Sequence, residues 1–172
     1  FSLPEQARQA KACVGYLPEQ PPLYPEMTVQ EYLDFAAELK GIKKKADRKE
    51  QVRKAACRTG LEEVLPRLIR SLSKGYRQRV GLAQAILGFP KIIILDEPTR
   101  GIDVGAKRDI YLLLGNLVRQ GKAVIMISSE IPELMGICDR IMVMCEGNYS
   151  GEVSREEFSQ ERIMTLASAI KV

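Results

Sequence analysis

The fold is decided by the stretch from Leu72 to Val104, LSKGYRQRVGLAQAILGFPKIIILDEPTRGIDV. Within it, the apolar run Ile92–Leu95 ends abruptly in two carboxylates, Asp96 and Glu97. A short continuous apolar run is typical of a buried parallel strand, and ligands of open α/β sheets bind at the carboxyl ends of such strands. We therefore expect Asp96 to hold Mg²⁺, directly or through water, and Glu97 to orient or deprotonate an attacking water.

A helix start lies at the other end of this stretch. Ser73 is a good N-cap, Gly75 has no Cβ to block an approaching ligand, and a periodic apolar run follows through Ile86. The free N–H groups of a helix N-terminus bind anions, phosphate above all. Taken alone, each segment also has a structural explanation, because strands ending in Asp-Glu and Ser-x-Gly caps occur in many α/β proteins. Their order and closeness favour a phosphate and metal site.

The motifs in this stretch resemble those of ATP-binding cassette (ABC) ATPases. LSKGYRQRV resembles the signature motif of that family, IIILDEPT resembles its Walker B strand with the catalytic glutamate, and Gly101–Asp103 falls at its D-loop. The order of these motifs is highly specific. The resemblance implies a partial P-loop NTPase of ABC type, which is an α/β fold. It would have a mostly parallel sheet flanked by helices, an α-helical subdomain, and a C-terminal β-hairpin plus helix.

The resemblance also implies an ATP site shared between two cassettes that close head to tail over two ATP molecules. The signature motif of one cassette would clasp the γ-phosphate held by the other cassette, while Asp96 and Glu97 serve their own site. The residues expected to bind nucleotide are Ser73, Lys74, Gly75, Tyr76 and Asp103.

An earlier segment, GYLPEQPPLYPEMTVQEYL, resembles the Q-loop region of the family. Aligned from Gly15 and Tyr16, Glu19 rather than Gln20 occupies the usual glutamine position. In the family this side chain reaches Mg²⁺ or the attacking water, so Glu19 is a further candidate for metal binding and catalysis. The alternative is that Glu19 and Gln20 are polar turn residues.

Two helices are expected after this loop. The first is Thr28–Lys40, with a capping box formed by Thr28 and Glu31, and the second runs over about Asp47–Arg58 and ends near Gly60. By resemblance, these helices belong to the small helical subdomain that faces the transmembrane subunits.

We expect this subdomain, with the signature motif, to span residues 23–88, and residues 1–22 and 89–172 to form part of the catalytic core. The candidate contacts to a membrane partner are Leu23, Tyr24 and Met27. Alternatively, these side chains cover the core of the subdomain itself.

Beyond the D-loop, periodicity predicts a helix over Ala106–Gln120, a buried strand over Ala123–Ser128, and a short helix over Pro132–Cys138. Ser129 stands where the family carries a switch histidine that contacts the γ-phosphate. That contact would fall here to a shorter, uncharged donor.

The end of the chain alternates in the manner of a hairpin. Its strands are expected at Arg140–Cys145 and Tyr149–Val153, around Gly147 and Asn148. A terminal helix with a capping box is expected to begin at Ser154.

The amino-acid composition of the chain argues against several classes of function. The 172 residues are 45% hydrophobic and carry a net charge of +4, which is too small an excess to predict nucleic-acid binding. No apolar stretch approaches the length of a membrane span. The chain has no histidine, which excludes histidine bases and histidine metal sites.

The cysteines are Cys13, Cys57, Cys138 and Cys145. They lack metal spacing and are expected to be reduced, with Cys13 and Cys145 in strands.

The largest departure from the family is that the chain contains no G-x-x-x-x-G-K-[ST] loop, the Walker A motif that supplies most ATP affinity. The chain therefore resembles a cassette truncated at its amino end, and we expect it not to hydrolyse ATP by itself. Residues up to about Thr99 resemble cassettes of exporter and gliding systems, whereas those from Arg100 resemble the second cassette of bacterial monosaccharide importers.

Three function hypotheses follow. The first is a fragment of the ATP-hydrolysing subunit of a membrane transporter, peripheral at the cytoplasmic face of a bacterial cell membrane. Its partners would be a second ABC ATPase domain and transmembrane permease subunits, its cofactors ATP and Mg²⁺. The second is a soluble ABC ATPase of DNA repair or translation. The third is a pseudo-cassette or fragment without turnover.

Overall fold

The structure is a computed structural model that describes residues 6–168 of the chain. The chain divides into two compact units, Phe1–Ile127 and Ser128–Val172. In the first unit the elements are α1 (Ala7–Ala12), β1 (Val14–Leu17), α2 (Val29–Leu39), α3 (Lys45–Thr59), α4 (Lys74–Ile86), β2 (Ile92–Asp96), α5 (Val104–Arg119) and β3 (Ala123–Ile127), with two short 3-10 turns between α3 and α4.

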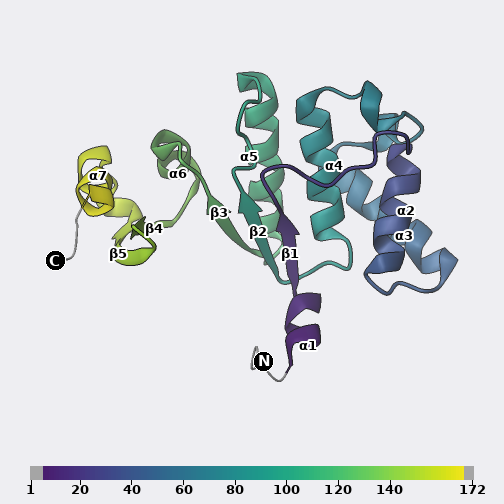
Figure 1. The fold of residues 1–172 in the computed structure, drawn as a ribbon, viewed down its shortest axis with the longest axis horizontal. Coiled ribbons are helices and arrows are strands. Elements are labelled where there is room, and N and C mark those ends of the chain that lie inside the picture. Colours follow the sequence, from purple (N-terminus) through teal and green to yellow (C-terminus); the bar gives the residue numbers. More distant parts are fainter. Residues whose placement is uncertain (1–5, 169–172) are drawn as a thin grey trace. The chain divides into compact units, whose positions relative to one another are not determined.

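A parallel sheet of three strands, in the order β1-β2-β3, forms the centre of this unit (Figure 1). Tyr16 of β1 is in register with Ile94 of β2, and Ile94 with Ile125 of β3. The helices α2, α3 and α4 come between β1 and β2 in the chain and lie on the β1 side of the sheet (Figure 1). The predicted α/β class and parallel sheet are therefore confirmed.

One face of the sheet carries the core. Leu17, Ile93 and Leu95 point to this face and are at most 1% exposed. They belong to one apolar cluster with α4 residues such as Leu82 and α5 residues such as Ile110. Because side chains alternate along a strand, the neighbouring residues of the same strands point to the opposite face.

The strand β3 differs from the prediction in its burial. Ile125 and Ile127 are 52% and 51% exposed, and Val124 and Met126 are only half-buried. In the sheet that the structure describes, β3 pairs with β2 alone, so it is an edge strand. The prediction of a buried strand at Ala123–Ser128 was therefore wrong, because an apolar sequence does not reveal whether a strand is central or at an edge.

The helical predictions hold closely in this unit. Thr28 Oγ1 accepts a hydrogen bond from the Glu31 N–H (3.2 Å), and Glu31 Oε2 accepts one from the Thr28 N–H (2.8 Å), which is the predicted capping box. The Thr28 N–H and the Thr28 hydroxyl both donate to Glu31 Oε2 (2.8 Å each), and these two bonds lower the pKa of Glu31. At the end of α3, Gly60 adopts the left-handed conformation (φ 64°) that terminates the helix as expected.

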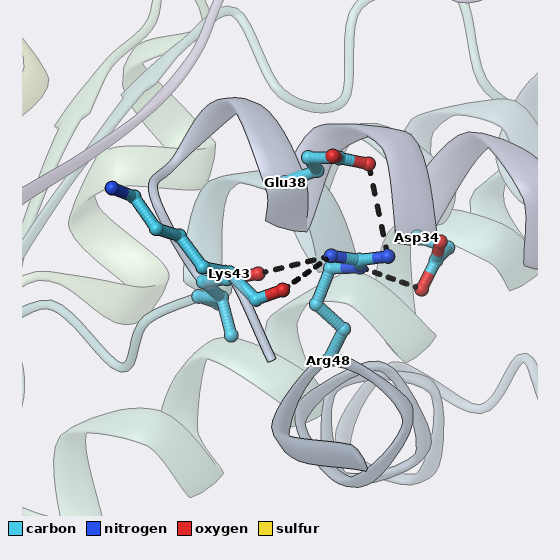
Figure 2. A network of polar contacts seen from close by, with 5 residues as sticks. Asp34, Glu38, Lys43 and Arg48 are labelled. Atoms are coloured by element: carbon cyan, nitrogen blue, oxygen red, sulfur yellow. Dashed lines mark hydrogen bonds and ion pairs between the residues drawn. The ribbon is translucent and has the colours of Figure 1, made fainter. Parts of the chain in front are cut away.

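A cluster of polar contacts around Arg48 joins α2 to α3 (Figure 2). The Arg48 side chain is only 11% exposed and pairs with Asp34 (3.2 Å) and Glu38 (3.7 Å) of α2. Its guanidinium also donates to the carbonyl oxygens of Ile42 (3.4 Å) and Lys43 (3.0 Å) in the connecting loop. One side chain therefore fixes both the helix pair and its connection.

The second unit contains α6 (Ile131–Ile137), β4 (Arg140–Cys145), β5 (Asn148–Ser154) and α7 (Gln160–Ser168), with a 3-10 turn before α7. The strands β4 and β5 are antiparallel, and their inward residues pack with Ile163 of α7, as predicted for a hairpin plus helix.

Two details of this unit differ from the predictions. Cys145 pairs with Asn148, so the turn consists of Glu146 and Gly147, both with positive φ (49° and 79°), rather than of Gly147 and Asn148. The final helix begins at Gln160, not at Ser154, because a 3-10 turn and an extended Phe158 intervene.

All four cysteines are free thiols. Cys145 lies in β4 as predicted, but Cys13 is the C-cap residue of α1 and precedes β1. Among residues 6–168, no helix has both the length and the hydrophobicity of a membrane span.

Arg48→Met is expected to lower the free energy of unfolding by about 1–3 kcal/mol, because four acceptors lose a largely buried charged donor. Arg53→Met, at an exposed position of the same helix, is the matched control and should change it by less than about 0.5 kcal/mol. Urea unfolding followed by circular dichroism gives both values. Equal midpoints for the two variants would show that the Arg48 cluster contributes nothing.

Candidate functional site

The predicted acids lie at the carboxyl end of the central strand β2. The Tyr16 hydroxyl of β1 donates to Asp96 Oδ2 (3.4 Å), and the Glu97 N–H donates to the Ile127 carbonyl of β3 (2.9 Å). Loss of solvent around the hydroxyl raises the pKa of Tyr16, and the charge and hydrogen bond of Asp96 raise it further. Contacts from both neighbouring strands thus hold the Asp96–Glu97 pair at this edge of the sheet.

Glu97 has an unusual backbone conformation. Its φ of 45° lies in the left-handed region, which costs a non-glycine residue roughly 1–3 kcal/mol and is frequent at functional sites. The bond to Ile127 and the Arg100 N–H bond to the Glu97 carbonyl (3.2 Å) stabilise this conformation. The chain therefore bends just after Asp96, where β2 ends.

The Q-loop candidate Glu19 is brought to the loop that follows β2. Its Oε1 pairs with the Arg100 guanidinium at 3.0 Å. Both side chains are substantially exposed, at 41% and 59%. The structure therefore connects the loop after β1 to the loop after β2, and Arg100 is a contact of the site that the sequence analysis did not find.

The next residues of the same loop are anchored to the helices. The Tyr32 hydroxyl lies within hydrogen-bond distance (3.4 Å) of the Pro22 carbonyl and of Gln84 Oε1 in α4. Leu23 and Met27 pack against the core of the unit, as the second of the two alternatives predicted. Tyr24 is 52% exposed and remains the candidate for a partner contact.

The signature motif forms the N-terminus of α4, as predicted. Ser73 is the N-cap and its hydroxyl accepts a hydrogen bond from the Tyr76 N–H at 3.3 Å. Ser73 and Lys74 are exposed, so the first turn of this helix is open to a ligand. Gly75 is buried, in contrast, and it lies where α4 meets α5.

The absence of a side chain at Gly75 allows this close approach. A Cβ atom added there would lie 2.9 Å from the Ala106 Cβ and 3.5 Å from the Ile102 Cγ2. Lys74 takes part in the same contact, because a Cβ atom added at Gly101 would lie 2.5 Å from its Nζ. The signature motif and the D-loop of one chain are therefore packed against each other.

Asp103 is the N-cap of α5. Its Oδ1 accepts a hydrogen bond from the Ala106 N–H at 2.9 Å, so the helix begins at Val104 and not at Ala106 as predicted. The side chain remains exposed. Its proposed nucleotide contact stays a prediction, and it would have to be made by a carboxylate that already caps a helix.

Arg79 is a second residue that the sequence analysis missed. Its guanidinium pairs with Asp109 of α5 and lies over the ring of Tyr76, 5.2 Å from the ring centroid. The Arg79 side chain is only 14% exposed. Spacing signals only the contact with Tyr76, since residues three apart on a helix lie on the same side.

Ser129 follows β3 at the start of the second unit and is exposed. Its neighbour Ser128 donates to Glu133 Oε2 (3.3 Å) and accepts from the Glu130 N–H (3.0 Å). The contact of Ser129 with a γ-phosphate stays a prediction.

The carboxylates fit a metal that arrives with a nucleotide better than a metal held by protein alone. In the described part of the chain, no group of three or more His, Cys, Asp or Glu side chains is placed to hold a metal ion. Mg²⁺ is commonly bound through one or two carboxylates together with water and substrate phosphates. Asp96 and Glu19 are suited to that role, although Glu19 is paired with Arg100.

Comparison with known proteins decides the family. Residues 2–100 match the family described as ABC transporter. The chain belongs to the ABC transporter family. The ribose import ATP-binding protein RbsA of Clostridium perfringens is 46% identical over 147 residues, 84% of this chain and 29% of that protein. The xylose import ATP-binding protein XylG of Moorella thermoacetica is 54% identical over 101 residues, 59% of this chain and 20% of that protein.

Solved ABC structures share the fold. The structure of cbiO1 from Clostridium perfringens, part of the ABC transporter complex cbiONQ, superposes with a TM-score of 0.79 at 28% identity. That match covers 91% of this chain and 62% of cbiO1. An ATP-binding subunit of an ABC transporter gives a TM-score of 0.75 at 24% identity, covering 98% of this chain and 69% of that one, and supports the fold alone.

This ABC chain spans less than a third of the length of its sugar-import relatives. The alignment to RbsA covers 147 residues of a 172-residue chain and therefore crosses Thr99. One importer thus matches residues on both sides of Thr99, where the two resemblances meet. The resemblance of the first part to exporter and gliding systems stays a prediction.

Gly75→Ala is expected to lower the free energy of unfolding by about 1–3 kcal/mol, because the new methyl group overpacks the contact with Ala106. Adding Ala106→Gly removes the clashing Cβ, so the double variant should be less destabilised than the sum of the single variants. The control is Gly115→Ala in α5, where an added Cβ meets nothing within 4 Å. The free energy of unfolding of that variant should rise by about 0.5–1 kcal/mol, because alanine has a higher helix propensity than glycine. Additive effects in chemical unfolding would contradict the close packing.

Tyr32→Phe is expected to change how stability depends on pH. Burial raises the pKa of Tyr32 to about 12, with a smaller contribution from Tyr24. Because the folded pKa lies above the unfolded value of about 10, the stabilisation is complete below pH 10 and is lost as pH rises from 10 to 12. Between pH 10 and pH 12, the free energy of unfolding of the wild type should fall by about 2 kcal/mol more than that of Tyr32→Phe. The exposed Tyr149→Phe should behave as wild type, and parallel curves for Tyr32→Phe and wild type would contradict the assignment.

Proposed function

We propose that this chain supplies a signature motif, Walker B acids and a D-loop to a composite ATP site that energises membrane transport. The main support is the joint geometry of these motifs, with Asp96 and Glu97 at the end of β2 and the exposed start of α4 packed on the D-loop. The relatives that match at 46% and 54% identity are import proteins, which favours transport over DNA repair or translation.

Each candidate residue has a distinct role in this proposal. When bound with ATP, Mg²⁺ would supply charge stabilisation of the transferred phosphoryl group, and Asp96 and Glu19 are the residues that would hold it. Glu97 would orient the attacking water and accept its proton. Ser129 would donate a hydrogen bond to a γ-phosphate.

The signature residues would act on the nucleotide of a second cassette. Ser73 offers a hydroxyl at the N-terminus of α4, and the helix dipole adds positive potential there. Lys74 adds a full positive charge beside the same turn. Gly75 keeps α4 close to α5, while Tyr76 presents a half-exposed ring and Asp103 caps α5 next to them.

The transport setting is also part of the proposal. The relatives named for ribose and xylose import suggest that the transported substrate is a sugar and that the direction is inward. Residues 23–88 would form the helical subdomain, with Tyr24 facing a permease subunit at the cytoplasmic side of the membrane, and residues 1–22 and 89–172 would belong to the catalytic core.

The test is equilibrium binding of a fluorescent ATP analogue with Mg²⁺, to this chain alone and mixed with a complete sugar-importer cassette that carries its own Walker A loop. We expect no binding to the chain alone, because no Walker A loop occurs in its 172 residues. In the mixture the affinity should rise above that of the complete cassette alone.

Ser73→Ala in this chain should weaken that gain about ten- to hundredfold, because a donor to a charged phosphate is lost. Ser71→Ala, a nearby exposed serine outside the motif, is the control. If the wild-type chain does not change the affinity of the mixture, it is not a signature donor, and the inert-fragment alternative is correct.

A further inference from the structure

The contacts of Arg79 indicate a role besides packing, because one of them is made with Tyr76 of the signature motif. The guanidinium meets three groups from three different elements. It lies over the Tyr76 ring in α4 (5.2 Å to the centroid), and it pairs with the Asp109 carboxylate of α5. Its third neighbour is the C-terminal end of α3, where a Cβ atom added at Gly60 would lie 3.2 Å from Arg79 Nη1.

These three contacts are complementary in charge. The end of α3 carries the partial negative charge of a helix C-terminus, the face of an aromatic ring carries partial negative charge, and Asp109 carries a full negative charge. The Arg79 side chain is 14% exposed, so these groups replace most of its hydration. A guanidinium is planar and weakly hydrated, which suits it to stack on a ring and pair with a carboxylate at the same time.

The aromatic ring that Arg79 contacts belongs to Tyr76 and is partly exposed to solvent. Tyr76 is 36% exposed and stands three residues after the N-cap Ser73, on the turn of α4 that is open to a ligand. The inner side of its ring is covered by the guanidinium. Without that support the side chain would be free to adopt other rotamers, and any stacking contact it makes would cost more side-chain entropy.

We infer that Arg79 is a positioning residue for Tyr76, held by Asp109 of α5, and that it fixes the Tyr76 ring as a flat surface for the nucleoside part of a nucleotide. This inference rests on the proposed function, because the nucleotide is the one bound at the composite site. The affinity contributed by the signature motif then depends on a contact between α4 and α5 and not on the motif residues alone.

The first arm of the test needs no nucleotide. The chain is labelled with ¹³C in its tyrosine rings, and the Tyr76 signal is assigned with Tyr76→Phe. Arg79→Lys keeps the positive charge but removes the planar face, and Asp109→Asn removes the paired charge. Both should shift the Tyr76 ring signal. The matched control Arg108→Met, at an exposed position next to Asp109, should leave it in place.

The second arm measures affinity for the fluorescent ATP analogue in the mixture with a complete cassette. Tyr76→Ala should weaken binding about five- to 150-fold, the range measured for loss of a base-aromatic stack. Arg79→Lys should weaken it about two- to thirtyfold. The double variant should be no weaker than Tyr76→Ala alone, since Arg79 acts through the ring. Asp109→Glu, which keeps the carboxylate, should stay within about twofold of wild type.

The outcomes separate the two proposals. A Tyr76 signal that does not move in Arg79→Lys overturns the positioning role, whatever the affinity shows. A signal that moves while the affinity of Arg79→Lys is unchanged, and that of Ser73→Ala falls, also overturns it. If the wild-type chain adds nothing to the mixture, the composite-site function and the nucleoside contact both fail, while the ring signal still decides whether Arg79 holds Tyr76.

Discussion

The close approach of α4 and α5 at Gly75 is the constraint on which the candidate site depends. Because a Cβ atom at this position would lie 2.9 Å from the Ala106 Cβ, only glycine permits the observed distance between the two helices. That distance brings Lys74 to Gly101 and allows Arg79 to reach Asp109. The absence of a side chain at Gly75, on the buried side of α4, therefore determines where the exposed first turn of this helix lies.

The sequence predicted the parts of this arrangement that depend on local pattern. The apolar run ending in Asp96 and Glu97, the capping box at Thr28, and the serine cap of α4 all have strong local signals, and the structure confirms them. Helix ends were predicted less accurately, because an aspartate such as Asp103 is common both in loops and at N-caps. The family match and the solved ABC structures bear out the fold class that these motifs implied.

Properties that depend on partners distant in sequence were not predictable. The pairs Glu19–Arg100 and Arg79–Asp109 join residues 81 and 30 positions apart, and no periodicity links them. The exposure of β3 is a property of sheet order, which an apolar run does not encode. The left-handed conformation of Glu97 is likewise imposed by its bond to Ile127 of a neighbouring strand.

The two missed ion pairs differ in what they contribute. Glu19 and Arg100 are both largely solvated, so their attraction is weak and a metal ion is able to compete for the carboxylate. Arg79 is largely buried, pairs with the Asp109 carboxylate and lies over the Tyr76 ring, so exchange of its partners would be costly. In the proposed site, the Glu19 side would therefore be able to rearrange when a nucleotide binds, whereas the Tyr76 side would be fixed in advance. This division suits a composite site, in which a preformed surface on one cassette closes over a nucleotide held by another.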